Sequence, residues 1–236
     1  MDFVCLASSS SANCYFLEFG GCKFLIEAGL PIKKIRQKLN FPLTEIDLCL
    51  VTHFHKDHSK SMNELSNFFK VAGSAETLKD SNLEVTENSI CLKKGVFNFK
   101  NIKIICFDVE HDCEGSLGFI FQNETETFLF VNDCKFIKYD LSQFEFDFIA
   151  IECNYNLELL QQSIKNGNYY AKRVLDTHMS LENLKMTLST YNLKKCKAIY
   201  LMHLSSLHAD EKKMIEEVQT ICGTPTYVCL KNGGFK

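Results

Sequence analysis

Histidine and aspartate side chains gather in one short segment of the sequence. Residues 52–58, THFHKDH, place three imidazoles and one carboxylate within six positions, directly after the apolar run DLCLV. Imidazole nitrogens and carboxylate oxygens are the usual ligands of zinc and related divalent ions. Because a loop after a strand can turn alternating side chains toward two neighbouring positions, we expect His53 and His55 to bind one metal ion and Asp57 and His58 a second.

The pattern HxHxDH after a hydrophobic strand resembles the signature of the metallo-β-lactamase superfamily, and the resemblance extends over nearly the whole chain. It implies that His111 completes the first site, that Asp133 bridges both ions and that His203 completes the second. Five of the seven histidines then occupy ligand positions, a check that does not depend on the family. We expect two divalent ions, zinc or else manganese, because availability often decides between metals at such sites.

The C-terminal half resembles the small WalJ-type exonucleases most closely. The segments IECNYNLELLQ, RVLDTHMSLENL and YLMHLSSLHADE follow one another in the same order and spacing, and LDTHMSLEN also looks like a segment of ribonuclease Z. The resemblance implies phosphodiester hydrolysis rather than lactam or thioester cleavage. It also implies that His178 is catalytic, protonating the leaving oxygen or clamping the phosphate, and that Asp57 helps to set the charge of the site.

The sequence departs from the family pattern at two places. Glu27 in LIEAG stands where relatives usually have Asp, and a carboxylate there is expected to orient a metal ligand. The segment from Ser8 to Asn13 matches a serine-rich loop of WalJ-type proteins but lacks its glycines. Neither change removes an expected metal ligand, whereas both affect the shape of the pocket.

Other polar residues leave two interpretations open. Three of them follow a buried-type strand and either line the substrate pocket or cap that strand: Glu152, Asn154 and Tyr155. Lys172 and Arg173 either contact phosphate or form a solvated face. The last histidine, His208, has no assigned role.

Composition sets limits on the class of protein. The 236 residues suit one α/β domain, 1–236, with ordinary fractions of hydrophobic and charged residues. A formal net charge of −3 with only two arginines argues against a strong field for long nucleic acid. The 12 cysteines lie in apolar runs without any CxxC pair, as is typical of reduced core thiols, and no signal peptide or membrane span is expected. We therefore expect a cytoplasmic enzyme.

Alternating and buried-type apolar runs predict the elements that position these residues. The expected strands are 3–7, 14–19, 23–27, 47–52, 89–93, 96–99, 102–108, 117–122, 127–132, 148–152 and 198–203. The expected helices are 31–39, 60–71, 156–166, 180–191 and 210–220. This order fits the α/β class, as an αββα sandwich with two mixed β-sheets face to face and helices outside.

The expected substrate is a small 3′,5′-cyclic nucleotide, and the alternative is a single-stranded DNA or RNA trimmed by a WalJ-type exonuclease. The chain leaves no room beyond the core for the RNA-binding arm of ribonuclease Z or the inserted domain of β-CASP nucleases. In this it resembles the phage anti-Pycsar phosphodiesterases, a resemblance that also implies a homodimer and immune evasion. Hydrolysis of another ester, or a binding protein that has lost catalysis, ranks below both.

Overall fold

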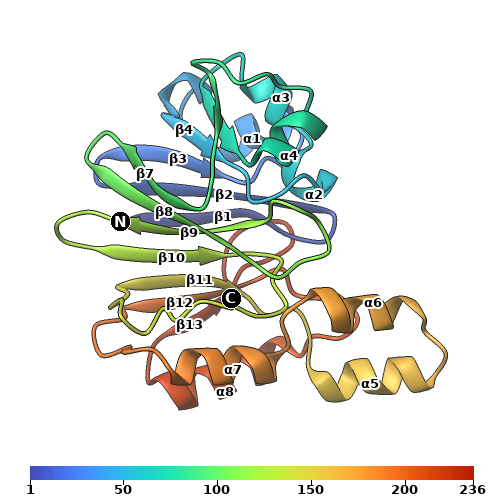
Figure 1. The fold of residues 1–236 in the computed structure, drawn as a ribbon. Helices are drawn as coiled ribbons and strands as arrows, with labels where there is room; N and C mark the ends of the chain where they lie inside the picture. Colours follow the sequence, from blue (N-terminus) through green and yellow to red (C-terminus); the bar gives the residue numbers. More distant parts are fainter.

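The computed structural model describes all residues, 1–236, and arranges them as two β-sheets with helices on both outer faces (Figure 1). The six-stranded sheet has the order β1-β2-β3-β4-β5-β6, and the seven-stranded sheet has the order β13-β12-β11-β10-β9-β8-β7. The strands of the first sheet are β1 (Asp2–Ser9), β2 (Ala12–Phe19), β3 (Cys22–Ile26), β4 (Leu48–Leu50), β5 (Lys70–Gly73) and β6 (Ser89–Cys91). Those of the second are β7 (Gly95–Phe99), β8 (Ile102–Asp108), β9 (Leu117–Gln122), β10 (Thr127–Val131), β11 (Phe148–Glu152), β12 (Ala198–Met202) and β13 (Thr226–Val228).

Helices from the two halves of the chain cover the two sheets separately. The first half supplies α1 (Ile32–Lys38), α2 (Lys56–Ser59), α3 (Met62–Leu65) and α4 (Ala75–Asp80), and the second half supplies α5 (Leu157–Lys165), α6 (Tyr170–Thr177), α7 (Leu181–Ser189) and α8 (Glu211–Cys222). The expected αββα sandwich is therefore confirmed. None of these helices has the length and apolar character needed to span a bilayer.

Alternation of side chains along the strands builds separate cores on the two faces of each sheet. In β10, Phe128 and Phe130 enter the core between the sheets, while Leu129 and Val131 face the core under α7 and α8. A third core lies between the first sheet and its helices. Because one-residue slips would exchange these faces, the burial pattern fixes the register and with it the positions of the strand ends.

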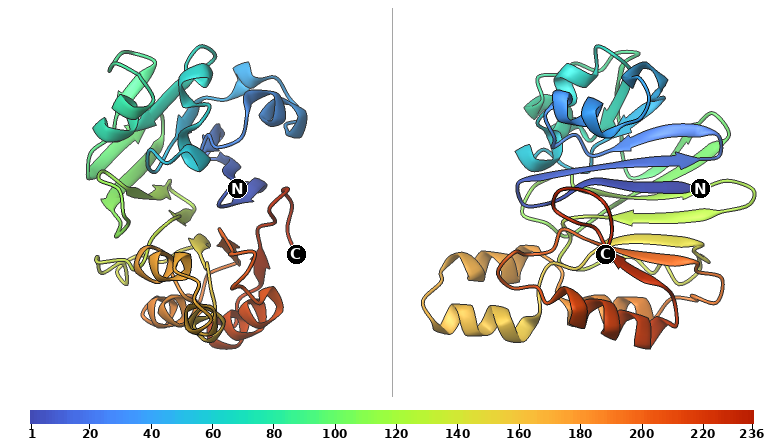
Figure 2. Two further views of the ribbon diagram at one scale, coloured as in Figure 1. Left: turned by 90° about the vertical axis from the view of Figure 1, so that its right-hand side faces the viewer. Right: turned by 180° about the vertical axis from the view of Figure 1, so that it is seen from behind.

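The carboxyl ends of several parallel strands meet at one edge of the sandwich. In the first sheet β3, β4, β5 and β6 pair in parallel, and in the second β10, β11, β12 and β13 do so. Figure 2 shows this edge facing the viewer in its left view, with the loops that follow these strands around its centre. Most of the segments with histidines and carboxylates follow these strands, and the segment with His111 follows β8, so the topology gathers them.

One expected helix was wrong. Residues 60–71 form the short helix α3 and then strand β5, because the run KVAG adds a parallel strand beside β4 with Val71 opposite Cys49. Sheet pairing overrides the helical spacing of Met62, Leu65 and Phe69, all of which are buried in the third core. Helices α2, α4 and α6 and strand β13 were not predicted.

Helices α5 and α6 form a hairpin that projects from the body beside the strand-end edge (Figure 1). Four buried residues, Tyr155, Leu160, Ala171 and Val174, hold the hairpin together as a small core of its own. The chain length was expected to leave no room for an RNA-binding arm such as that of ribonuclease Z, and it does accommodate this short hairpin.

The cysteines form no disulfide. Nine are buried, and burial raises the pKa of the thiol of Cys106 to about 12. Cys91, Cys196 and Cys222 are half-buried. The arrangement agrees with core thiols in the reduced form, as the apolar sequence context predicted.

Candidate metal centre

Three of the predicted ligands form a first group at the strand-end edge. The Nδ1 atom of His55 lies 3.2 Å from Nε2 of His53 and 3.3 Å from Nε2 of His111. His53 follows β4 and is buried, as is the imidazole ring of His111, whereas the ring of His55 is partly exposed. Three imidazole nitrogens that converge in this way can share one cation.

The remaining four predicted ligands form a second group. The Oδ2 atom of Asp57 lies 3.3 Å from Nε2 of His58 and 3.6 Å from Nε2 of His203. Asp133 stands between the two groups, because its Oδ2 atom is 3.4 Å from Nε2 of His58 and 3.7 Å from Nε2 of His111. The structure thus brings all seven residues together, with Asp133 in the position of a bridging group.

Unsatisfied buried atoms show that the donor set fits divalent cations. The Nε2 atom of His203 and the Oδ1 atom of Asp133 are buried without a hydrogen-bond partner. Such atoms are rare in folded proteins because each loses its contact with water. Both belong to ligand types that prefer zinc and similar ions, and each of the two groups keeps its ligand atoms within 4.8 Å of one another.

Hydrogen bonds fix which ring nitrogen faces the centre. The Thr52 hydroxyl donates to Glu27 Oε1 at 2.6 Å, so His53 Nδ1–H donates to the Thr52 oxygen at 2.9 Å. His111 Nδ1 donates to the backbone carbonyl of Thr177 at 3.1 Å. In both rings the lone pair therefore stays on Nε2, which faces the centre.

Glu27 also supports the second group. Its Oε1 atom lies 3.1 Å from Nδ1 of His58, and it is fully buried at the end of β3. The next segment packs directly on the loop that carries the ligands: a Cβ on Gly29 would lie 1.7 Å from the backbone oxygen of Asp57. The Glu27 side chain, which is longer than Asp, thus still reaches a candidate ligand. At position 29 the close approach of the Asp57 backbone leaves no space for a side chain.

Three residues at the site adopt left-handed backbone conformations. The φ angle is 66° at Glu27, 44° at Asp133 and 54° at His203. Each residue directly or closely follows a strand end, where the positive φ turns its side chain back toward the edge. Non-glycine residues rarely adopt this conformation, and they do so mostly where the surroundings impose it.

Burial and charge displace the pKa values of the site in opposite directions. Burial holds the pKa of His53 well below its usual value. At His203 burial alone would lower the pKa, but Asp133, Asp57 and Glu152 outweigh it and raise it to about 10. His58 also has a raised pKa, because Asp133 and Glu27 outweigh the effect of burial. The carboxylates therefore create a field that favours cations at the second group.

His178 lies beside the second group and pairs with Glu152. Its Nδ1 atom is 2.5 Å from Oε1 of Glu152, and its ring stacks on that of His203 with centroids 5.2 Å apart. Burial alone would raise the pKa of Glu152, but His178 and His203 outweigh it and lower it. Of the two open interpretations of Glu152, its contacts agree with a role at the site.

The other undecided residues fall in different places. Asn154 donates to the backbone oxygen of His203 at 2.7 Å, whereas Tyr155 is buried in the small core of the α5–α6 hairpin. Lys172 lies over the ring of Tyr169 on that hairpin. His208 lies outside the groups of converging ligand atoms, with Nδ1 3.3 Å from Ser205 Oγ.

Sequence reasoning missed two residues at the centre, Asp112 and Cys113. The carboxylate of Asp112 lies 3.2 Å from Nε2 of His111 and accepts two hydrogen bonds from Arg173, at 2.9 and 2.6 Å. The thiol of Cys113 lies within 4.8 Å of the ligand atoms of the first group. Asp112 and Arg173 are far apart in the sequence, so no local pattern signals their contact.

Comparisons with known proteins agree with this geometry. A profile of the metallo-beta-lactamase superfamily matches residues 9–94. The exodeoxyribonuclease WalJ of Streptococcus pneumoniae is 28% identical over 222 residues, which cover 85% of this chain and 80% of that protein. The metallo-beta-lactamase fold protein YhfI from Bacillus subtilis superposes with a TM-score of 0.75 at 13% identity over 98% of both chains. The short form of human tRNase Z superposes with a TM-score of 0.63 at 16% identity, over 87% of this chain and 93% of that one.

Proposed function

We propose that this chain, a metal-dependent hydrolase with the metallo-β-lactamase fold, cleaves phosphodiester bonds of nucleic-acid strands. The observation that carries the proposal is the position of the His178–Glu152 pair, which lies against His203 at the edge of the candidate metal centre. A metal centre with a neighbouring proton donor has the two parts that phosphodiester hydrolysis needs. The similarity to an exodeoxyribonuclease supports the substrate class.

The seven candidate ligands would hold two divalent ions. His53, His55 and His111 would bind one ion, and Asp57, His58 and His203 the other, with Asp133 between them. When bound in such a site, divalent ions activate water and stabilise the charge that develops on the phosphoryl oxygens. Zinc is the metal that we propose, since the donors are mainly imidazole nitrogens.

The protein itself would move one proton and orient its groups. Glu152 fixes the His178 ring through Nδ1, so Nε2 is left to donate a proton to the oxygen that leaves. Glu27 and the Thr177 carbonyl keep the ligand rings in place. Arg173, which is tied to Asp112 beside His111, lies close enough to the centre to meet a phosphate of the bound strand.

Cyclic nucleotide hydrolysis is the second candidate, with the immune-evasion role that the phage resemblance implies. The net charge of −3 favours it, because polymer binding normally draws on a positive field. The similarity to an exodeoxyribonuclease supports strand cleavage as the first candidate. The homodimer and the cytoplasmic location stay predictions, which light scattering and fractionation would check.

A substrate panel tests the proposal. Zinc-loaded and manganese-loaded protein would be offered end-labelled single-stranded DNA and RNA and the 3′,5′-cyclic mononucleotides, with His55→Ala as the inactive control. Metal-dependent shortening of strands supports the proposal. Opening of cyclic nucleotides without strand shortening would transfer the function to the second candidate, and inactivity on all of them would contradict phosphodiester chemistry.

A further inference from the structure

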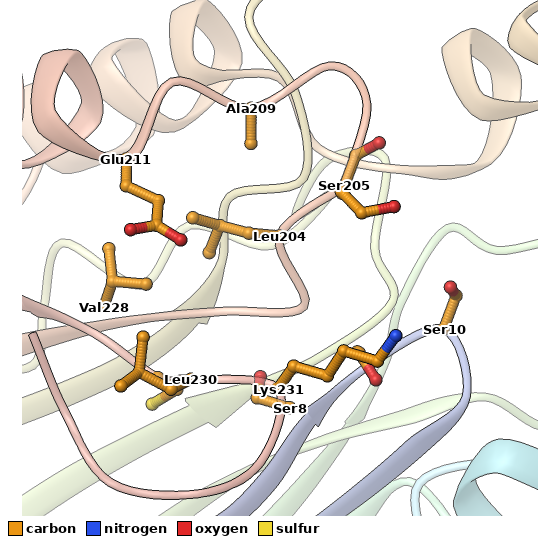
Figure 3. A pocket seen from close by; sticks show the side chains of 12 residues that line it. Ser8, Ser10, Leu204, Ser205, Ala209, Glu211, Val228, Leu230 and Lys231 are labelled. Atoms are coloured by element: carbon orange, nitrogen blue, oxygen red, sulfur yellow. The ribbon is translucent and has the colours of Figure 1, made fainter.

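A hollow of about 320 Å³ adjoins the chain segment that directly follows His203; Figure 3 shows the side chains that line it. Its walls come from the β1–β2 turn, the loop after β12 and the loop after β13, and we call it the serine pocket because five serines line it: Ser8, Ser9, Ser10, Ser205 and Ser206. The volume lies at the lower end of the range for small-molecule sites. The pocket is thus of a size for one nucleotide unit rather than for a folded nucleic acid.

The walls of the serine pocket are tied to the second group of candidate ligands. The backbone N–H of His203 donates to Ser8 Oγ at 2.8 Å, and Leu204 and Ser205 follow His203 directly into the wall. On the other side, Asn13 donates to the Ser9 carbonyl at 3.0 Å and to Asp57 Oδ2 at 3.3 Å. A ligand in the pocket would therefore lie next to the group that holds Asp57 and His203.

The lining combines hydroxyl groups, one cation and an apolar part. Lys231 extends from the loop after β13 toward Ser10, across from Ser205 (Figure 3). Lys231 forms no ion pair, whereas the one carboxylate of the lining, Glu211, is neutralised by Lys236 at 2.7 Å. The apolar part consists of Leu204, Ala209, Val228, Cys229 and Leu230. The hydroxyls of Ser8, Ser9 and Ser205 form hydrogen bonds within the protein, which leaves those of Ser10 and Ser206 for a ligand. These two hydroxyls and an unpaired ammonium suit a phosphate, and the apolar part suits a sugar or base.

We propose that the serine pocket binds the terminal phosphate monoester of a nucleic-acid strand. The inference rests on the proposed function and makes it more specific, because a strand held by its end presents a phosphodiester bond near that end to the metal centre. A terminal monoester carries more negative charge than an internal diester, so Lys231 would discriminate between them. The enzyme would then remove nucleotides from a phosphorylated end rather than cut at internal positions.

Binding of nuclease-resistant strands tests the pocket apart from catalysis. Zinc-loaded protein would be titrated into fluorescein-labelled phosphorothioate oligothymidylates that carry a 5′-phosphate, a 3′-phosphate or only hydroxyl ends, and anisotropy would report the Kd. We expect one terminal phosphate to tighten binding about ten-fold, as one charge-assisted contact does. The strand that gains affinity identifies which end the pocket accepts.

Variants of matched charge locate the effect. Lys231→Gln should abolish the preference for the phosphorylated end, and Ser206→Ala should reduce it, while Lys33→Gln on helix α1 removes an equal charge elsewhere and should preserve it. A wild-type protein without any preference, or a preference that survives Lys231→Gln, would overturn the pocket assignment. Neither result depends on hydrolysis. The titration therefore tests the pocket alone, while the substrate panel tests the proposed function.

Discussion

The Nδ1 atom of His178 lies 2.5 Å from the Oε1 atom of Glu152, and the second oxygen of that carboxylate is held by the protein backbone. Glu152 Oε2 accepts the N–H groups of Cys134 at 2.7 Å and Met179 at 3.1 Å. The carboxylate is therefore fixed from the loop after β10 and from the segment between α6 and α7. A ring oriented so firmly has one nitrogen left for chemistry.

Replacement of His178 should separate proton transfer from metal binding. We expect His178→Ala to lower kcat about 10²–10⁴-fold, the usual contribution of a positioned general acid, with unchanged bound metal. Turnover and plasma mass spectrometry would measure the two quantities. Loss of an ion together with activity would instead make His178 a ligand, an arrangement that its proximity to Asp133 and His203 allows.

Loss of one candidate ligand should change metal content. His55→Ala removes one of the three imidazole nitrogens that converge in the first group, the Nδ1 atom of His55. Because two nitrogens hold an ion less tightly than three, we expect bound metal to fall from about two ions per chain toward one. The control is His208→Ala, because this variant also removes one imidazole but from a buried position outside the groups of converging ligand atoms. Equal metal content in both variants would contradict the assignment of the first group.

Removal of metal should destabilise the whole fold. The candidate ligands come from the ends of strands in both sheets, so bound ions would connect the two sheets across the edge. With free metal 100-fold above Kd the stabilisation is about 2.7 kcal/mol, which corresponds to a Tm shift of roughly 5–10 °C for a chain of this size. Calorimetry before and after chelation measures the shift, and an unchanged Tm would argue against tight binding.

Glu27 should act on affinity for the metal rather than on catalysis. Glu27→Gln keeps the shape but removes the negative charge beside His58, and we expect metal affinity to fall about 10–100-fold. Glu27→Asp restores the charge with a shorter reach and should recover part of that loss. Competition with a chelator measures both variants, and identical affinities for Gln and wild type would exclude this supporting role.

Asp147 should make stability depend on pH. Burial alone would raise its pKa, but the N–H of Thr127 at 2.9 Å and the ammonium groups of Lys195 and Lys197, both at 3.3 Å, outweigh burial and lower it. A carboxyl whose pKa is lowered by folding stabilises the protein above the unfolded pKa of about 3.9 and loses this contribution as pH falls through the folded value.

We therefore expect Asp147→Asn to lower the free energy of unfolding by about 1–3 kcal/mol at pH 7 and by less near pH 3, where the contribution of the carboxylate is already declining. Urea unfolding of both proteins at each pH gives the difference, so titration of the buried histidines cancels. The control, Asp2→Asn at an exposed position of β1, should show no such change. A penalty for Asp147→Asn that is the same at both pH values would contradict the ionic contribution.

Much of the fold was readable because the apolar pattern is strong where the strands are. Strands β8, β9 and β11 begin and end at the predicted residues, since each alternates between two cores or lies buried on both faces. The exceptions are segments that gain order only from partners. Strand β5 forms because it pairs with β4, and β13 because it pairs with β12. The sequence of each short segment does not indicate that it pairs with a strand elsewhere in the chain.

The candidate ligands were predictable in two ways. Residue type and strand context indicate His53, His55, Asp57 and His58, whereas His111, Asp133 and His203 were assigned from the resemblance to the metallo-β-lactamase superfamily. The contact between Asp112 and Arg173 depends on how the α5–α6 hairpin packs against a loop, which no periodicity encodes. The serine pocket likewise depends on three loops that meet only after both sheets have formed.

The left-handed backbone at Glu27, Asp133 and His203 has a consequence for the later history of this scaffold. Such a conformation costs a non-glycine residue about 1–2 kcal/mol, and here it serves only to aim side chains at the edge. A descendant that no longer needed an ion would gain stability by accepting glycine or asparagine at these three positions. Selection for stability would thus favour replacements that remove these three side chains from the site. Because each replacement would have to be reversed at a cost in stability, the activity would be hard to regain once lost.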